Sequence, residues 1–264
     1  MKSNELSSQE LFIRNYKKEQ ITISLARFFV FAGFLFLWES LSYFQIIDSF
    51  FFSSPTGILL LFIDMCKNLE IFIHTGITLY ETLLSFFIVN MLSIIVAILL
   101  LSFNTLSKIS EPYLVILNSL PKSALAPLII VWLGTGSKTI IVAGISVAVF
   151  GSIINLYTGF LQVDNEKLKL IRTLGGTKKD ELLKVIVPSS IPIIISNMKV
   201  NIGLSLVGVI IGEFLAARRG LGYLIIYGSQ IFQLDLLILS IIILCIIALM
   251  LYKSIDFIEK RYQK

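Results

Sequence analysis

Residues 139–163 read TIIVAGISVAVFGSIINLYTGFLQV, a run of 25 residues without a charged side chain. An α-helix needs about 20 mostly apolar residues to cross the hydrocarbon core of a bilayer. The run is long enough for this and contains no proline. It therefore predicts a membrane-spanning helix and decides the fold class.

Further apolar runs lie on both sides of this segment. They cover residues 21–47, 72–102, 112–133, 188–212 and 236–252. The first is longer than the roughly 7–15 apolar residues of a signal peptide, so we expect an uncleaved span. The sequence predicts an all-α integral membrane protein of about six transmembrane helices. Residues 1–20 form a polar N-terminal segment, and residues 21–264 form a single transmembrane domain.

The composition excludes several classes of protein. The chain is 56% hydrophobic and 15% charged, with a mean hydropathy of +0.89, whereas soluble domains are about 45–50% apolar and roughly 25% charged. A soluble enzyme and a disordered chain do not fit. The net charge of +5 does not indicate nucleic acid, because the basic residues fall between apolar runs. Cys66, Cys245 and the lone His74 form no metal motif, and we expect them to serve packing.

The basic residues also predict the orientation. With the N-terminus inside, segments 1–24, 103–111, 163–189 and 253–264 hold fifteen Lys and Arg residues, and the three outer segments hold four. Cytoplasmic loops are enriched in Lys and Arg. We therefore expect both termini in the cytoplasm of a cell whose inner membrane holds the chain.

The longest cytoplasmic connection, residues 163–187, has the pattern of two short helices. Leu168, Ile171 and Leu174 recur at a spacing of three, and Gly175-Gly176 supplies a helix stop. Thr177 with Asp180 resembles a capping box that starts a second helix. Two interpretations are open on physical grounds. The helices lie on anionic lipid through their lysines, or they dock against another protein.

This connection resembles the signature loop of ABC-importer permeases. That loop contains Glu-Ala-Ala, three residues, Gly, nine residues, and Ile-x-Leu-Pro. Gly175 and Pro188 match its glycine and proline, and Val185 and Val187 replace its Ile and Leu. The Glu-Ala-Ala triplet is absent, since residues 169–171 are Lys, Leu and Ile.

The resemblance extends over about residues 70–260 and is closest to the nitrate/sulfonate/taurine-type branch. Segments 120–128 (LPKSALAPL), 132–134 (WLG), 212–214 (GEF) and 220–223 (GLGY) are similar to that branch, as are Asn155, Gly159 and Val163-Asp164. Any one motif is weak. Four motifs in the right order, with the right topology, make a specific match.

The resemblance implies a permease that holds no nucleotide itself. Its partners would be two ABC ATPase subunits, which bind ATP and Mg, an extracytoplasmic substrate-binding protein, and a second permease copy as a homodimer. The residues implied to couple to the ATPase are Leu170, Ile171, Arg172, Leu174, Gly175, Gly176 and Asp180. Those implied near an outer gate are Glu213, Gly220, Leu221 and Gly222.

Charged and helix-breaking residues inside the spans mark a candidate substrate path. Lys122 lies about eleven residues into the third run, between Pro121 and Pro127. A charge at that depth costs at least ~2.5–3.5 kcal/mol, so Lys122 either lines the path or pairs with an acidic residue such as Glu81. Lys199 either lines the path or extends toward the cytoplasmic surface.

Glu213, at the outer end of the fifth run, has two interpretations. It pairs with Arg218 or Arg219, or it contacts substrate. Structural pairing fits its position better.

We therefore expect the transmembrane subunit of an ATP-driven importer. Its cargo would be a small anion such as a sulfonate, taurine or nitrate, or alternatively a thiamine precursor or other small organic solute. A gradient-driven secondary transporter is the second class, and a membrane-embedded enzyme is the third. Residues 134–139 (GTGSKT) do not match a phosphate-binding loop, which needs Gly, four residues and Gly-Lys-Ser/Thr.

Overall fold

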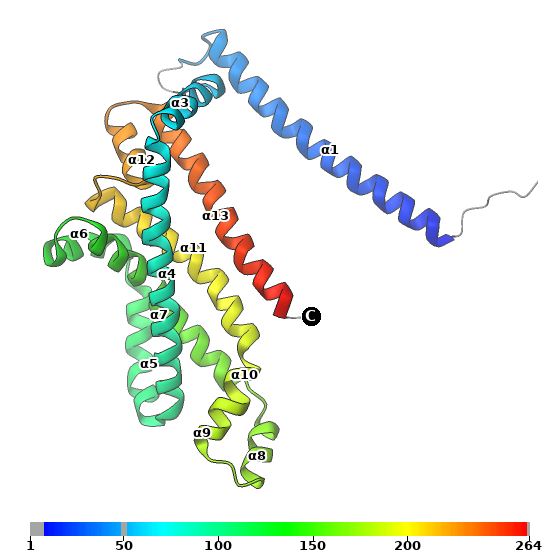
Figure 1. The fold of residues 1–264 in the computed structure, drawn as a ribbon, viewed down its shortest axis with the longest axis vertical. Coiled ribbons are helices and arrows are strands. Elements are labelled where there is room, and N and C mark those ends of the chain that lie inside the picture. The colour runs from blue at the N-terminus through cyan, green and yellow to red at the C-terminus, as the bar shows by residue number, and fades with distance from the viewer. Residues whose placement is uncertain (1–7, 49–51, 263–264) are drawn as a thin grey trace, which may run out of the picture.

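The computed structural model describes residues 8–48 and 52–262, and the elements found there are helical (Figure 1). The long helices are α1 (Ser8–Tyr43), α4 (Glu70–Ser102), α7 (Ser137–Leu161), α11 (Ile191–Ala216) and α13 (Leu234–Tyr262). The intermediate ones are α3 (Pro55–Lys67), α5 (Asn104–Ser119), α6 (Lys122–Leu133) and α12 (Leu221–Gln230). The connection between α7 and α11 holds α8 (Asn165–Thr173), α9 (Lys178–Asp180), a π-helical turn at Glu181–Ile186 and α10 (Val187–Ser189).

The predicted spans are confirmed, with one refinement. Five described helices are long and apolar enough to cross a membrane, or six if a bent pair counts as one span. That pair is α5 and α6, which meet at 96°. The sequence predicted one span over residues 112–133. The chain bends sharply there because Pro121, which has no backbone N–H, sits in an extended conformation just before α6.

The core is formed by α4, α7 and α11, which pack side by side (Figure 1). Glycines allow a close approach between α7 and α11. A Cβ atom added to Gly208 would lie 2.8 Å from the Gly144 Cα, and one added to Gly212 would lie 2.9 Å from the Ile140 Cα. A side chain at either glycine would therefore force the two helices apart.

Helix α1 leaves the rest of the bundle at an angle (Figure 1). It starts at Ser8, so it includes much of the polar N-terminal segment. Its C-terminal end is tied to α3, where Glu39 accepts hydrogen bonds from the Thr56 backbone N–H at 3.1 Å and the Thr56 hydroxyl at 2.8 Å. Trp38 donates to the Phe52 carbonyl at 3.3 Å.

Helix α3 lies in the predicted outer connection, where no element was predicted. The Ser54 hydroxyl caps it by accepting from the Gly57 N–H at 3.0 Å, and Pro55 occupies its first turn. Proline is well suited to that position because the first-turn N–H groups have no helical partner.

Candidate functional site

The α7–α11 connection folds into two helical segments at a glycine corner. The predicted stop is confirmed: Gly175 adopts φ +80°, and the Gly176 N–H donates to the Ile171 carbonyl at 2.9 Å. The predicted capping box is also confirmed. The Asp180 N–H donates to the Thr177 hydroxyl at 3.3 Å, and the Thr177 N–H donates to the Asp180 carboxylate at 2.9 Å.

An ion pair that the sequence did not predict joins the two segments. Arg172 of α8 donates to the Glu181 carboxylate through Nε at 2.6 Å and through Nη2 at 3.0 Å. Only a tenth of the Glu181 side chain is exposed. The hydrogen bonds from Arg172 hold the pKa of the Glu181 carboxyl below its ordinary value. Lys184 and Thr177 likewise lower the pKa of Asp180. The connection is therefore a braced unit with a defined shape.

The apolar side chains of this connection divide between two faces. Leu168 and Leu182 pack against the buried cluster of Leu156, Phe160 and Ile186. Leu170, Leu174 and Leu183 point outward and are 60%, 75% and 54% exposed. The sequence placed Leu168 and Leu174 on one stripe, whereas the corner turns Leu174 away from the core. We call Leu170, Leu174 and Leu183 the exposed leucine patch.

At the opposite end, the 220–222 turn is bonded to two helices. The Gly220 N–H donates to Nδ1 of His74 at 3.0 Å, and the Leu221 N–H donates to the Thr78 hydroxyl at 2.8 Å. Glu213 accepts from the Thr78 hydroxyl at 2.7 Å and from the Gly222 N–H at 2.5 Å. These bonds fix the first turn of α12 against α4 and α11.

The structure gives Glu213 a different set of partners from the one expected. No ion pair within the described residues joins Glu213 to Arg218 or Arg219, both of which are exposed. The carboxylate instead turns inward and binds the backbone start of α12. An acidic group is favourable there because the free N–H groups of a helix N-terminus carry partial positive charge.

Both intramembrane lysines have local partners. Lys122 Nζ contacts the Leu117 carbonyl near the end of α5 and lies 5.1 Å from the centre of the Phe150 ring. No ion pair within the described residues joins Lys122 to Glu81, its expected alternative partner. Lys199 lies between α11 and α13, where it pairs with Asp256 at 2.6 Å and with Glu259. Pro121 and Pro127 are exposed on either side of the start of α6.

A ladder of polar side chains runs through the core. Asn201 of α11 donates to Asn90 of α4 and to Ser152 of α7, both at 2.9 Å. Asn197 donates to Ser152 at 2.7 Å and accepts from Asn155 at 2.9 Å. Hydrogen-bonded amides at this depth hold the three helices in one register, because a slip would leave buried polar groups without partners.

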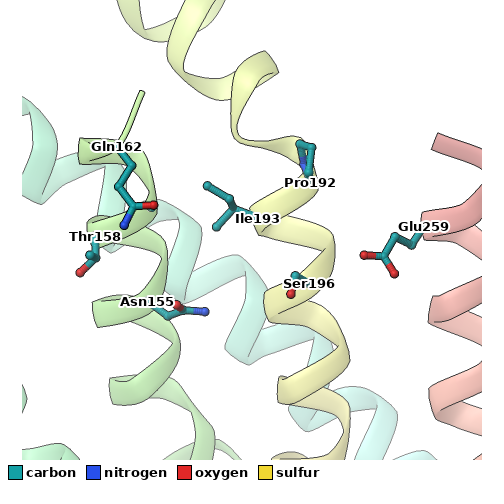
Figure 2. Close-up of a pocket in the computed structure, with 8 residues that line it drawn as sticks. Asn155, Thr158, Gln162, Pro192, Ile193, Ser196 and Glu259 are labelled. Atoms are coloured by element: carbon teal, nitrogen blue, oxygen red, sulfur yellow. The ribbon is translucent and has the colours of Figure 1, made fainter. Parts of the chain in front are cut away.

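The ladder ends at a polar cavity of about 390 Å³ on the side of the α7–α11 connection. Figure 2 shows Asn155 on α7 and Gln162 just past its end directed toward α11, which carries Ser196, while Glu259 reaches in from α13. Thr158 also lines the cavity, and its hydroxyl points away from α11 in this view. Sequence reasoning did not single out Thr158, Gln162 or Ser196. Their polar side chains within otherwise apolar helices could have indicated a polar cavity.

A helical membrane domain with a sharply bent helix pair and a braced connection between two spans fits a membrane transport subunit. Residues 89–264 match the family model described as "Binding-protein-dependent transport system inner membrane component". The chain belongs to this family, whose members are the permeases of ABC importers.

Individual relatives agree with this assignment. The chain is 32% identical over 189 residues to a probable ABC transporter permease protein of Haemophilus influenzae, covering 72% of this chain and 77% of the relative. It is 23% identical to the taurine transport system permease protein TauC of Escherichia coli, covering 98% of this chain and 95% of TauC.

The fold also matches a solved structure, the inward-facing MetNI methionine ABC transporter. The TM-score is 0.62 at 18% identity, covering 71% of this chain and 94% of the matched chain. The chain is therefore a multi-pass membrane permease subunit of an ABC importer.

Proposed function

We propose that two copies of this chain enclose the solute path of an importer for small sulfonates such as taurine, and that two ATPase subunits drive it from the cytoplasm. An extracytoplasmic binding protein delivers the solute to the outer end. ATP and Mg are held by the ATPase subunits, and both termini of this chain lie in the cytoplasm.

The observation that carries the ATPase assignment is the exposed leucine patch. Three large apolar side chains stand on a unit that is braced by the Arg172–Glu181 pair and by the Thr177–Asp180 capping box. A loop held only on lipid needs no such bracing. A surface that must transmit force to a partner needs both an apolar contact area and a fixed shape.

The path is proposed on the exposed face of α11 and at the start of α6. Val200 and Val207 are about half exposed on α11, with Gly203 between them. The candidates for lining the path at the bend between α5 and α6 are still Pro121, Lys122 and Pro127. Lys199 stays a candidate, although its two carboxylate partners leave it little free charge.

The preference for anions is better supported by the outer arginines. Arg218 and Arg219 are exposed at the outer end of α11 and have no ion-pair partner within the described residues. They are free to attract an anionic solute, and TauC, whose name specifies taurine, aligns over almost the whole chain.

The test is co-purification of the tagged chain from its native cells in mild detergent. We expect an ABC ATPase in equal amount, its loss in Leu174→Asp, and its retention in Leu174→Met, which keeps an apolar side chain. Replacing Gly175 by Arg should also remove the ATPase, because only a φ-permissive residue fits the corner. Transport that runs on an ion gradient without ATP would instead establish a secondary transporter.

A further inference from the structure

A small cavity at the outer end of the bundle contains a buried carboxylate without a partner. The cavity is about 240 Å³ and lies between α4, the start of α7 and the turn after α11. Glu81 of α4 lines it and is 0% exposed. Neither carboxylate oxygen of Glu81 has a hydrogen-bond partner. A charge removed from water in this way requires compensation by a proton or by a positive group.

The polar neighbours of Glu81 carry no positive charge. Its polar neighbours are Ser137 and Glu213. Glu213 is a second buried carboxylate, and it already receives hydrogen bonds from Thr78 and from the Gly222 N–H. Two carboxylates side by side disfavour each other's ionised forms, so a positive group beside Glu81 would stabilise both.

The mouth of the same cavity has the opposite charge. Arg218 and Arg219 line it and are exposed, and the ion pairs found in the described part of the chain do not include them. The cavity is therefore negative at its buried end and positive at its mouth. A water molecule occupies about 30 Å³ in the liquid, so the cavity has room for a solute of about eight non-hydrogen atoms.

We propose that this outer acidic cavity binds small zwitterionic solutes, with the ammonium group against Glu81 and the sulfonate or carboxylate group against Arg218 and Arg219. This inference rests on the proposed function and narrows it. The permease itself selects amino sulfonates and short ω-amino acids over simple anions. A simple anion satisfies the arginines but leaves Glu81 unpaired.

The experiment measures binding of radiolabelled taurine to the complete transporter, permease and ATPase together, in nanodiscs without binding protein or ATP. Unlabelled β-alanine should displace taurine, because it carries the same two charges. Ethanesulfonate lacks the ammonium group and ethylammonium lacks the anion, so each should compete at least about tenfold less well.

Variants test which side chains bind the ammonium group and which bind the anionic group of the solute. Glu81→Gln should weaken taurine binding by about tenfold or more and leave the weak competition by ethanesulfonate unchanged. The double variant Arg218→Gln/Arg219→Gln should weaken both the binding of taurine and the competition by ethanesulfonate. Glu39→Gln is the matched control, since Glu39 is an intramembrane glutamate held by Thr56 on another helix, and it should bind taurine normally.

The outcomes separate this inference from the proposed function. Wild-type affinity in a folded, ATPase-associated Glu81→Gln transporter would overturn the inference and make Glu81 a structural carboxyl. Absence of taurine and β-alanine binding would also overturn it, and ATP-driven uptake of ethanesulfonate by the same transporter, reconstituted in proteoliposomes with its binding protein, would leave the proposed function intact. A preparation with no associated ATPase and no ATP-dependent uptake would overturn the proposed function itself.

Discussion

At the scale of single residues, the Gly220 turn has the tightest steric requirement at the outer end. Gly220 adopts φ +120°, and an added Cβ atom would lie 2.4–2.7 Å from the carboxyl atoms of Glu213. A side chain there meets both backbone strain and a clash with the carboxylate that holds α12.

We predict that Gly220→Ala lowers the free energy of unfolding by at least roughly 1 kcal/mol. The matched control is Gly203→Ala on α11, where no atom lies within 4 Å of the added Cβ. That change should be neutral or slightly stabilising, because alanine is the better helix former. Thermal unfolding in detergent measures the stability of both variants. Equal stability of the two would contradict the steric requirement at Gly220.

At the scale of elements, the Arg172–Glu181 pair should determine whether the two coupling segments hold their relative position. We predict that Glu181→Arg uncouples ATPase hydrolysis from transport, since two like charges would then face each other across the corner. The double exchange Arg172→Glu/Glu181→Arg should restore a substantial part of the coupling. The ratio of ATP hydrolysed to solute imported checks this, and a double exchange no better than the single one would contradict it.

The same pair predicts a dependence on pH. Because Arg172 lowers the pKa of Glu181 from its ordinary 4.5, the pair stabilises the corner fully above that value. Its contribution is lost as the pH falls through the lowered pKa, and Asp180 acts in the same direction. Hydrogen exchange across residues 164–190, corrected for the intrinsic effect of pH, should be constant from pH 7 to about pH 5 and rise below about pH 4.

The control for the pH experiment is the double variant Asp180→Asn/Glu181→Gln. It should exchange faster at pH 7 and lose most of the acid-dependent increase. An unchanged acid transition in that variant would place the titrating groups elsewhere.

Element identity followed from the sequence wherever one local pattern determined it. Apolar length identified the spans, and Gly175, Thr177 and Asp180 identified the corner. The bend at Pro121 was harder, because proline also occurs in continuous transmembrane helices. The bonds around Glu213 were not predictable, since Thr78 and Glu213 lie 135 residues apart and no local pattern links them.

At the scale of the whole molecule, the orientation in the membrane is open to a direct test. In a variant with Cys66 and Cys245 replaced by Ala, Lys138→Cys at the start of α7 should react with an impermeant maleimide in intact cells. Lys178→Cys in the coupling connection should react only after permeabilisation. Both positions are exposed in the structure. A reversed labelling pattern would therefore show that the orientation in the membrane is opposite to the predicted one.

The glycine contacts between α7 and α11 have a mechanical consequence. A closely packed helix pair moves most easily as one rod, and the end of this pair that enters the α7–α11 connection carries the exposed leucine patch. At about 1.5 Å per residue, the 25 residues of α7 span about 38 Å, so a tilt of about 10° displaces the far end by about 6–7 Å. That far end holds Ser137 and Glu213, beside the outer acidic cavity. If the proposed ATPase pushes on the leucines, a rigid helix pair would carry that motion as a lever to the mouth of the cavity.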